Sequence, residues 1–346
     1  MSTPSRPSLV RHWLALAEEL VGRAAPRLDA LNLFPVPDAD TGTNMLATLT
    51  AARTAADACP AQDDAGAVLA HAGAAALDSA RGNSGMLLAV GLAGMAEPLR
   101  GRERVDAFAL AAAFGAADRA ARQALSDPRE GTILTVLSAA ARSLARSSTQ
   151  APDTPAVAGD ADPAVRLGPA VTLMLADCVQ AVEETESLLA PLTRAHVVDA
   201  GAVGLLWVFE ALRAVVTGTP VDEELATALP GYVGGAHAAE GEPAAAAEAP
   251  TEGAVEVMGT LALTPLAAAE LRRRLTDVGD AVILAPVGTA RDGQGRVPWR
   301  VHVHVPRAAD AIGPLRAAGD VEGLAVTDLA GPSHGHDAAP DGCHGR

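Results

Sequence analysis

The first 216 residues consist of apolar runs with helical spacing, separated by short polar turns that contain glycine. Val10, Leu14 and Val21 belong to the first run, and such spacing is typical of an amphipathic helix. Aromatic residues make up only 2% of the chain, so alanine, leucine and valine must build the core. Further helices are expected over 43–57, 65–80, 84–97, 104–125, 131–146, 164–189 and 201–216. These runs predict an all-α domain of about eight helices over residues 1–216.

An acidic loop precedes the second of these helices. It reads Pro35-Val36-Pro37-Asp38-Ala39-Asp40-Thr41-Gly42-Thr43-Asn44-Met45. Mg²⁺ takes one or two carboxylate ligands together with substrate phosphates, and backbone N–H groups at a helix N-terminus suit phosphate oxygens. Asp38 and Asp40 therefore predict a site for a metal–nucleotide complex. The alternative is a proline-stiffened loop whose Asp and Thr side chains cap the helix.

Two other ligand-binding motifs are excluded. The chain contains no lysine, which the P-loop motif requires. An EF-hand that began at Asp38 would have Leu49 at the position of its bidentate acid.

Three more glycine-containing turns open apolar helices. They are Arg81-Gly82-Asn83-Ser84-Gly85, Glu130-Gly131-Thr132 and Val198-Asp199-Ala200-Gly201-Ala202. Glycine allows a ligand to approach the backbone closely, and the Ser84 hydroxyl can bond a phosphate. Each turn alone is equally consistent with an ordinary helix–helix connection. Together with the acidic loop, they predict loops gathered around one ligand at one rim of the bundle.

These segments resemble the N-terminal kinase domain of the fatty acid kinase family, in its A-type form, which is related to the L subunit of bacterial dihydroxyacetone kinase. The resemblance rests on residues 31–45, 80–85, 130–134 and 197–201, which occur in the family's order. It implies an eight-helix barrel of the dihydroxyacetone kinase L-subunit type. It also implies that Asp38 and Asp40 are the catalytic residues, which bind Mg²⁺ on the phosphates of ATP.

The resemblance further assigns a nucleotide pocket. The resemblance also extends the Mg²⁺-binding role to Asn32, which stands where the dihydroxyacetone-kinase branch has a third metal-binding aspartate. The residues implied to line or close the pocket are Thr41, Thr43, Asn44, Ser84, Gly85, Thr132, Asp199 and Gly201. Ala39 departs from the family, which usually has glycine between the two acids; if φ is positive there, alanine adds strain.

The composition changes after residue 216. Residues 217–253 are rich in Pro, Gly, Ala and Glu and predict a flexible linker, and residues 331–346 predict a disordered tail. Residues 254–330 show the order β-α-β-β-α-β, which is typical of a small ferredoxin-like α+β domain. Its elements are expected over 255–263, 266–276, 281–287, 297–305, 308–318 and 321–328.

Two histidines in this second domain are candidate metal ligands. His302 and His304 lie two residues apart on an expected strand, so both side chains should face the same side. Two imidazoles on one face can chelate Zn²⁺, and a solvated strand face is the alternative. The family's middle domain, which this region resembles, adds a cysteine on its first strand. Here that strand begins Ala254-Val255-Glu256-Val257 and has none.

The net charge of −16 argues against binding to nucleic acid or to an anionic membrane surface. No stretch is expected to span a bilayer, and no signal-peptide pattern is evident. Three cysteines do not make a disulfide framework. A cytoplasmic protein is expected.

The resemblance implies ATP-dependent transfer of the γ-phosphoryl group to a fatty-acid carboxylate held by a separate binding protein, which gives an acyl phosphate. A homodimer is also expected. Because the family's further C-terminal domain is absent from the sequence, a short form is expected. Two alternatives stay open: a kinase for a small hydroxyl substrate such as dihydroxyacetone, and a non-catalytic nucleotide-binding regulator. No histidine lies in the four matching segments, and a carboxylate needs no general base, which favours the carboxylate acceptor.

Overall fold

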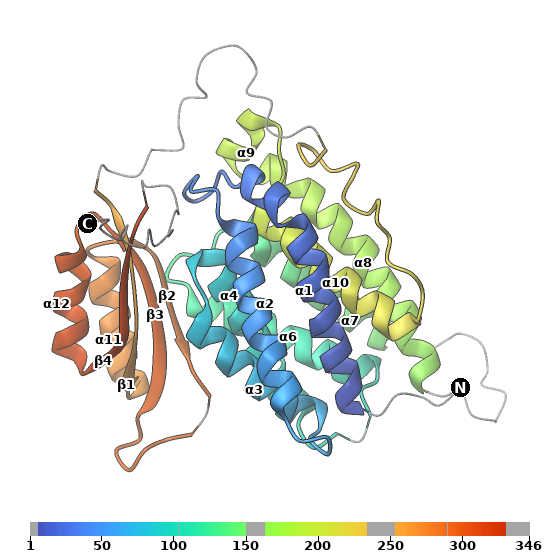
Figure 1. Cartoon of the computed structure of the whole chain (residues 1–346), viewed down its shortest axis with the longest axis horizontal. Coiled ribbons are helices and arrows are strands. Elements are labelled where there is room, and N and C mark those ends of the chain that lie inside the picture. The colour runs from blue at the N-terminus through green and yellow to red at the C-terminus, as the bar shows by residue number, and fades with distance from the viewer. Residues whose placement is uncertain (1–5, 103, 150–162, 234–252, 289, 330–346) are drawn as a thin grey trace, which may run out of the picture.

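The computed structural model describes residues 6–102, 104–149, 163–233, 253–288 and 290–329. A larger helical part and a smaller part of sheet and helices lie side by side (Figure 1). The helical part contains α1 (Arg6–Leu31), α2 (Thr41–Ala58), α3 (Ala65–Ser79), α4 (Gly82–Gly94), α5 (Ala96–Leu99), α6 (Ala107–Ala124), α7 (Ile133–Thr149), α8 (Pro163–Leu188), α9 (Ala190–Ala195) and α10 (Ala200–Thr217).

Small side chains let these helices approach one another closely. A Cβ atom on Gly73 would lie 2.6 Å from the Cα atom of Ala93, so α3 and α4 meet backbone to backbone. The indole N–H of Trp13 donates to the carbonyl of Val208 at 2.8 Å and fastens α1 to α10. The core contains few aromatic side chains, and the helices fill the space by packing closely on one another.

The predicted helices are confirmed, with small differences at their ends. The helix expected over 84–97 is divided into α4 and α5, and the short helix α9 was not predicted. The mostly helical character of this part is therefore established, whereas its description as an eight-helix barrel stays a prediction.

The helix α10 is, among the described helices, long and apolar enough to cross a membrane by length and composition alone. This differs from the expectation that no such stretch exists. Of its 18-residue window, 78% is buried inside the protein. A buried core helix can be equally long and apolar, so the burial of α10 identifies it as a core helix of the bundle.

The structure differs from the expected linker over residues 217–233. Thr217 ends α10, and the residues that follow form a connection whose turns, over 223–233, pack on the bundle. The side chain of Tyr232 is only 4% exposed and accepts a hydrogen bond from Trp207 Nε1 at 3.2 Å. The Arg27 guanidinium lies 5.4 Å from the centre of the Tyr232 ring. The segment is ordered because Leu229 and Tyr232 give it an apolar face that is buried on the bundle. The average composition of the segment does not reveal these two residues.

The rest of the predicted linker, 234–252, and the predicted tail over 331–346 lie outside the described residues. Separate folding of residues 1–216 and 254–330 stays a prediction.

The order β-α-β-β-α-β expected for the second part is confirmed. Its elements are β1 (Val255–Leu263), α11 (Pro265–Thr276), β2 (Asp280–Pro286), β3 (Val297–Val305), α12 (Ala308–Ala318) and β4 (Val321–Asp328). The strands pair in the order β2-β3-β1-β4, and each neighbouring pair is antiparallel.

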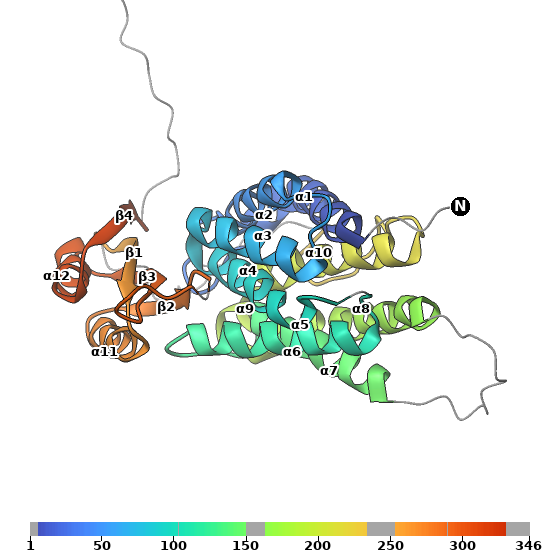
Figure 2. The same cartoon turned by 90° about the horizontal axis from the view of Figure 1, so that it is seen from below.

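The two faces of the sheet bury different partners. Val257 and Val303 pack in a core with residues of α11 and α12, which cover one face (Figure 2). Met258 and Ile283 lie on the other face and belong to the core of the helical part. His302 is paired with both of these residues in the sheet register, so it also faces the helical part.

The edge of β2 is covered by the loop between α6 and α7. Leu125 forms an isolated antiparallel bridge with Ile283, and the N–H of Ser126 donates to the carbonyl of Val282 at 3.0 Å. The Arg272 guanidinium donates to the carbonyl of Gln123 at 2.7 Å. These bonds protect an edge strand and hold the sheet against the bundle.

Candidate functional site

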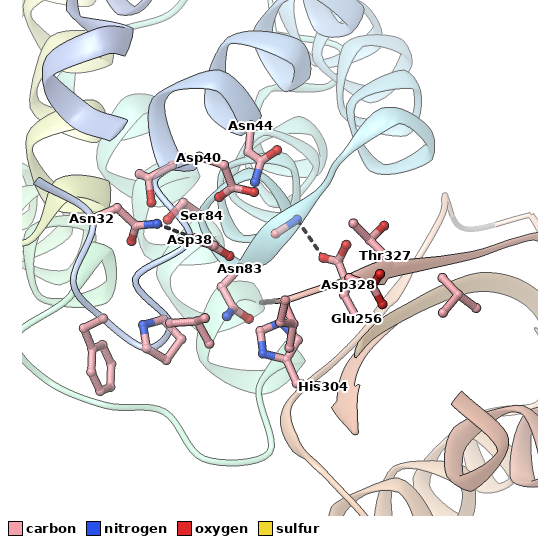
Figure 3. A pocket seen from close by; sticks show the side chains of 17 residues that line it. Asn32, Asp38, Asp40, Asn44, Asn83, Ser84, Glu256, His304, Thr327 and Asp328 are labelled. Carbon is pink, nitrogen blue, oxygen red and sulfur yellow. Dashed lines mark hydrogen bonds between the residues drawn. The ribbon is translucent and has the colours of Figure 1, made fainter. Parts of the chain in front are cut away.

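An acidic cavity of about 380 Å³ lies where the sheet meets the N-termini of α2 and α4 (Figure 3). Its volume is in the range of small-molecule sites. The polar side chains that line it are Asn32, Asp38, Asp40, Thr41, Asn44, Asn83 and Ser84 from the helical part, and Glu256, His304, Thr327 and Asp328 from the sheet. The cavity is therefore completed by both parts of the chain.

Asp38 and Asp40 form a close pair of half-buried carboxyl groups in this cavity. Burial, together with the charge and hydrogen bond of Asp40, raises the pKa of Asp38 to about 7 against the opposing hydrogen bond donated by Asn32. Burial also raises the pKa of Asp40. The negative charges of the nearby Glu256 and Asp29 raise it further. Such a pair favours a shared proton or a divalent cation between the two groups.

The N-terminus of α2 is capped by a residue that was not predicted from the sequence. The Asp29 carboxylate accepts hydrogen bonds from the N–H groups of Gly42 at 2.7 Å and Thr43 at 3.0 Å, and from the Thr43 hydroxyl at 2.8 Å. Asp40 stands at the N-cap position but makes no capping bond with its side chain. Its carboxyl group is thereby left for the cavity, whereas Thr43 is directed to Asp29.

The backbone between the two acids is strained. Ala39 has φ of 54°, in the left-handed region that costs an alanine about 1–2 kcal/mol. Strain was expected at this residue on the condition that its φ is positive, and that condition is met.

The turn before α4 brings a second helix N-terminus to the cavity. Gly82 has φ of 58°, and a Cβ atom there would lie 2.5 Å from Nδ2 of Asn44. Its N–H donates to Oε1 of Glu256 at 3.0 Å. The buried Oδ1 atom of Asn83 has no hydrogen-bond partner among the described residues, which leaves it available to a ligand.

The other two predicted turns lie behind the cavity. A Cβ atom on Gly201 would lie 2.8 Å from Oγ of Ser84, so the starts of α10 and α4 touch. The Asp199 carboxylate caps α10 through the N–H of Ala202 at 2.8 Å and also meets the N–H of Ile133 in α7. Burial raises the pKa of Asp199 to about 7 against these bonds. The four turns are thus gathered at one rim, but only the first two line the cavity, so their arrangement around one ligand stays a prediction.

The predicted site residues therefore divide into two groups. Those that line the cavity are Asn32, Asp38, Asp40, Thr41, Asn44 and Ser84. Those that do not line it are Thr43, Gly85, Thr132, Asp199 and Gly201. Thr132 caps α7 through a hydrogen bond from the N–H of Leu134 at 3.3 Å. Thr43 and Asp199 take part in the caps of α2 and α10.

The two histidines of β3 lie beside an acid from β1. Donor atoms of Glu256, His302 and His304 all lie within 4.8 Å of one another, and all three side chains are buried. His302 is 0% exposed, so the alternative of a solvated strand face is wrong. Burial and the neighbouring His302 lower the pKa of His304 to about 3.

Glu256 is the third member of this cluster and was not predicted. Burial alone would raise its pKa, but the hydrogen bonds with His302 and Gly82 hold it at about 2. The sequence feature that could have indicated it is an acid between two valines of an apolar strand. In the sheet this acid lies opposite His304. Asp29, Asn83, Thr327 and Asp328 were also missed.

The structure thus combines a helical bundle, in which two helix N-termini lie beside paired acids, with a small α+β part, and a cavity lies between them. The chain belongs to the DAK2 domain family, whose model matches residues 35–214. This is a kinase-related family whose domain binds nucleotide.

Curated relatives cover the same region. The chain is 33% identical to Protein YloV of Bacillus subtilis over 211 residues, which is 61% of this chain and 35% of that protein. It is 32% identical to Uncharacterized protein SH1689 of Staphylococcus haemolyticus over 198 residues, which is 57% of this chain and 33% of that protein. The chain thus spans about a third of the length of these relatives.

Proposed function

We propose that the protein is an ATP-dependent phosphotransferase whose nucleotide binds in the acidic cavity with Mg²⁺ on Asp38 and Asp40. The observation that carries this proposal is the carboxyl pair itself. Burial and mutual repulsion raise the pKa of Asp38 to about 7, so a hard divalent cation would relieve an unfavourable concentration of charge. The donor set therefore fits the metal that the nucleotide requires.

The residues of the chain have distinct parts in this proposal. The amide of Asn32 donates to Asp38 and fixes the orientation of its carboxylate. Asn44, Asn83 and Ser84 line the cavity and offer polar atoms to a nucleotide. Mg²⁺, when bound, neutralises charge that develops on phosphate oxygens. Residues of the sheet complete the lining of the cavity.

The proposed acceptor is a fatty-acid carboxylate that a lipid-binding partner protein presents. A carboxylate is already ionised near neutral pH and needs no general base. The histidine that lines the cavity, His304, has a pKa of about 3 and would accept a proton from a hydroxyl group poorly. This supports the carboxylate over a small hydroxyl substrate such as dihydroxyacetone.

ATP consumption by the purified protein tests the acceptor. We expect turnover to require a fatty acid loaded on its carrier protein and to be absent with dihydroxyacetone alone. Turnover with dihydroxyacetone would select the hydroxyl kinase instead. Nucleotide binding without turnover under either condition would select the non-catalytic regulator.

We also propose that Glu256, His302 and His304 hold Zn²⁺. The Nε2 atom of His302 and the Nδ1 atom of His304 are buried without hydrogen-bond partners among the described residues, which fits a missing ligand. Metal analysis of the purified protein should find zinc, and His302→Ala should contain less of it than the parent protein. Equal zinc content in both proteins would reject this site.

A homodimer and a cytoplasmic location stay predictions.

A further inference from the structure

A second cluster of metal-binding side chains lies at the far end of α2 from the cavity. Cys59 follows the last residue of α2, Asp63 lies in the connection to α3, and His71 lies within α3. One donor atom from each residue lies within 4.8 Å of the others. The cluster is separate from the acidic cavity, which none of the three residues lines.

The connection that carries this cluster is held in place by bonds to other parts of the bundle. Arg11 of α1 donates to the carbonyl of Cys59 at 2.8 Å and to that of Pro60 at 3.2 Å. Asp64 fixes the start of α3 through the N–H of Ala67 at 2.8 Å. These bonds do not use the three donor side chains. The donors are therefore brought together without a metal, which lowers the cost of ordering them on binding.

The chemistry of the three donors selects the metal. A thiolate, an imidazole and a carboxylate are the usual ligands of Zn²⁺, whereas Mg²⁺ and Ca²⁺ require oxygen. A Cys thiolate and an Asp carboxylate together carry the charge that balances one divalent cation. His71 is exposed and the other two side chains are half-buried, so solvent can complete a tetrahedral site.

We propose that Cys59, Asp63 and His71 bind one Zn²⁺ ion, with water as the fourth ligand, and thereby tie the end of α2 to α3. The Cys59 thiol donates to the carbonyl of Ala55 at 3.3 Å. The thiol proton is released to solvent as the sulfur binds the metal.

Cobalt titration tests this site because Co²⁺ reports directly on thiolate ligation. The full chain with Cys343→Ser is used, so that the thiol of the C-terminal tail cannot contribute. We expect a thiolate-to-cobalt charge-transfer band in the near ultraviolet that saturates during the titration and disappears on addition of zinc. The Glu256, His302 and His304 cluster has no thiolate and cannot give this band.

Matched variants complete the test. In the same background, Cys59→Ser should abolish the band, and His71→Ala or Asp63→Asn should weaken cobalt binding by at least about tenfold. His12→Ala removes an exposed histidine of α1 and should change nothing. Zinc should raise the melting temperature of the parent protein by more than that of Cys59→Ser, because the second proposed zinc site, at Glu256, His302 and His304, is present in both proteins. Absence of the band in the parent protein, or its persistence in Cys59→Ser, would overturn the proposal.

Discussion

The carboxylate of Glu256 accepts a hydrogen bond from the backbone N–H of Gly82 at 3.0 Å across 174 residues of sequence. The same oxygen lies 3.0 Å from Nδ1 of His302. One side chain of the sheet therefore joins the histidine cluster to the turn that opens α4. The acidic cavity lies directly beside this contact (Figure 3).

Loss of the Glu256 carboxylate should destabilise the protein. Glu256→Ala leaves the half-buried N–H of Gly82 and the buried His302 without their acceptor, at a cost of about 1–3 kcal/mol in the free energy of unfolding. Glu256→Gln keeps an acceptor for Gly82 and should cost less. Chemical denaturation measures both values. Glu322→Ala, at an exposed position of β4, is the control and should stay within about 0.5 kcal/mol of the parent protein.

The strained backbone at Ala39 predicts a stabilising substitution. Ala39→Gly removes the steric cost of φ at 54°, while glycine adds conformational entropy to the unfolded chain. We expect a net gain of up to about 1 kcal/mol in the free energy of unfolding. Ala47→Gly, at an exposed position inside α2, should have the opposite sign and cost about 1 kcal/mol. A loss of stability in Ala39→Gly would show that this backbone conformation is not strained.

The buried cap at Asp199 predicts a pH dependence of stability. Its pKa is raised to about 7, so the unfolded chain releases this proton at a lower pH than the folded protein. The protonated form of Asp199 therefore stabilises the folded protein. This contribution to the free energy of unfolding is complete below about pH 4 and is lost as the pH rises to about 7, by at most about 1.4 kcal/mol per pH unit. Asp199→Asn does not titrate, so its stability relative to the parent protein should increase across this range.

A second cap provides the control for Asp199. Burial alone would raise the pKa of Asp64, but hydrogen bonds from the N–H groups of Ala67 and Gly101 outweigh it and lower the pKa. The stabilising contribution of Asp64 is complete above about pH 4 and is lost only as the pH falls further. The difference between Asp64→Asn and the parent protein should therefore be constant from about pH 4 to 7. A constant difference for Asp199→Asn as well would contradict the account.

Sequence patterns predicted the elements of this fold more completely than its long-range contacts. The bounds of β1 and β3 agree with the predicted ranges because apolar alternation and turn residues are local signals. The carboxyl pair was also predictable, because Asp38 and Asp40 are close in sequence.

The missed residues act at a distance along the chain. Asp29 caps α2 from 13 residues before Gly42, where no local capping pattern indicates it. Glu256 reaches the cavity only because the sheet packs on the bundle. Tyr232 orders a segment whose composition resembles a linker, since its burial depends on Trp207 and Arg27.

Asp38 and Asp40 are the proposed ligands of the metal in a metal–nucleotide complex. Asp38→Asn and Asp40→Asn should each lower Mg²⁺-dependent ATP affinity by at least about tenfold, because a ligand of the metal is lost. The same changes remove the repulsion between two half-buried carboxyl groups, so thermal stability should be unchanged or higher. Asp127→Asn, in an exposed loop, is the control for loss of one negative charge.

The most direct measurement is calorimetric titration of the parent protein and these variants with ATP, in the presence and absence of Mg²⁺. The account predicts Mg²⁺-dependent binding to the parent protein and to Asp127→Asn, and its loss in Asp38→Asn and Asp40→Asn, which remain folded. Unchanged affinity in both variants, or ATP binding that does not depend on Mg²⁺, would contradict it.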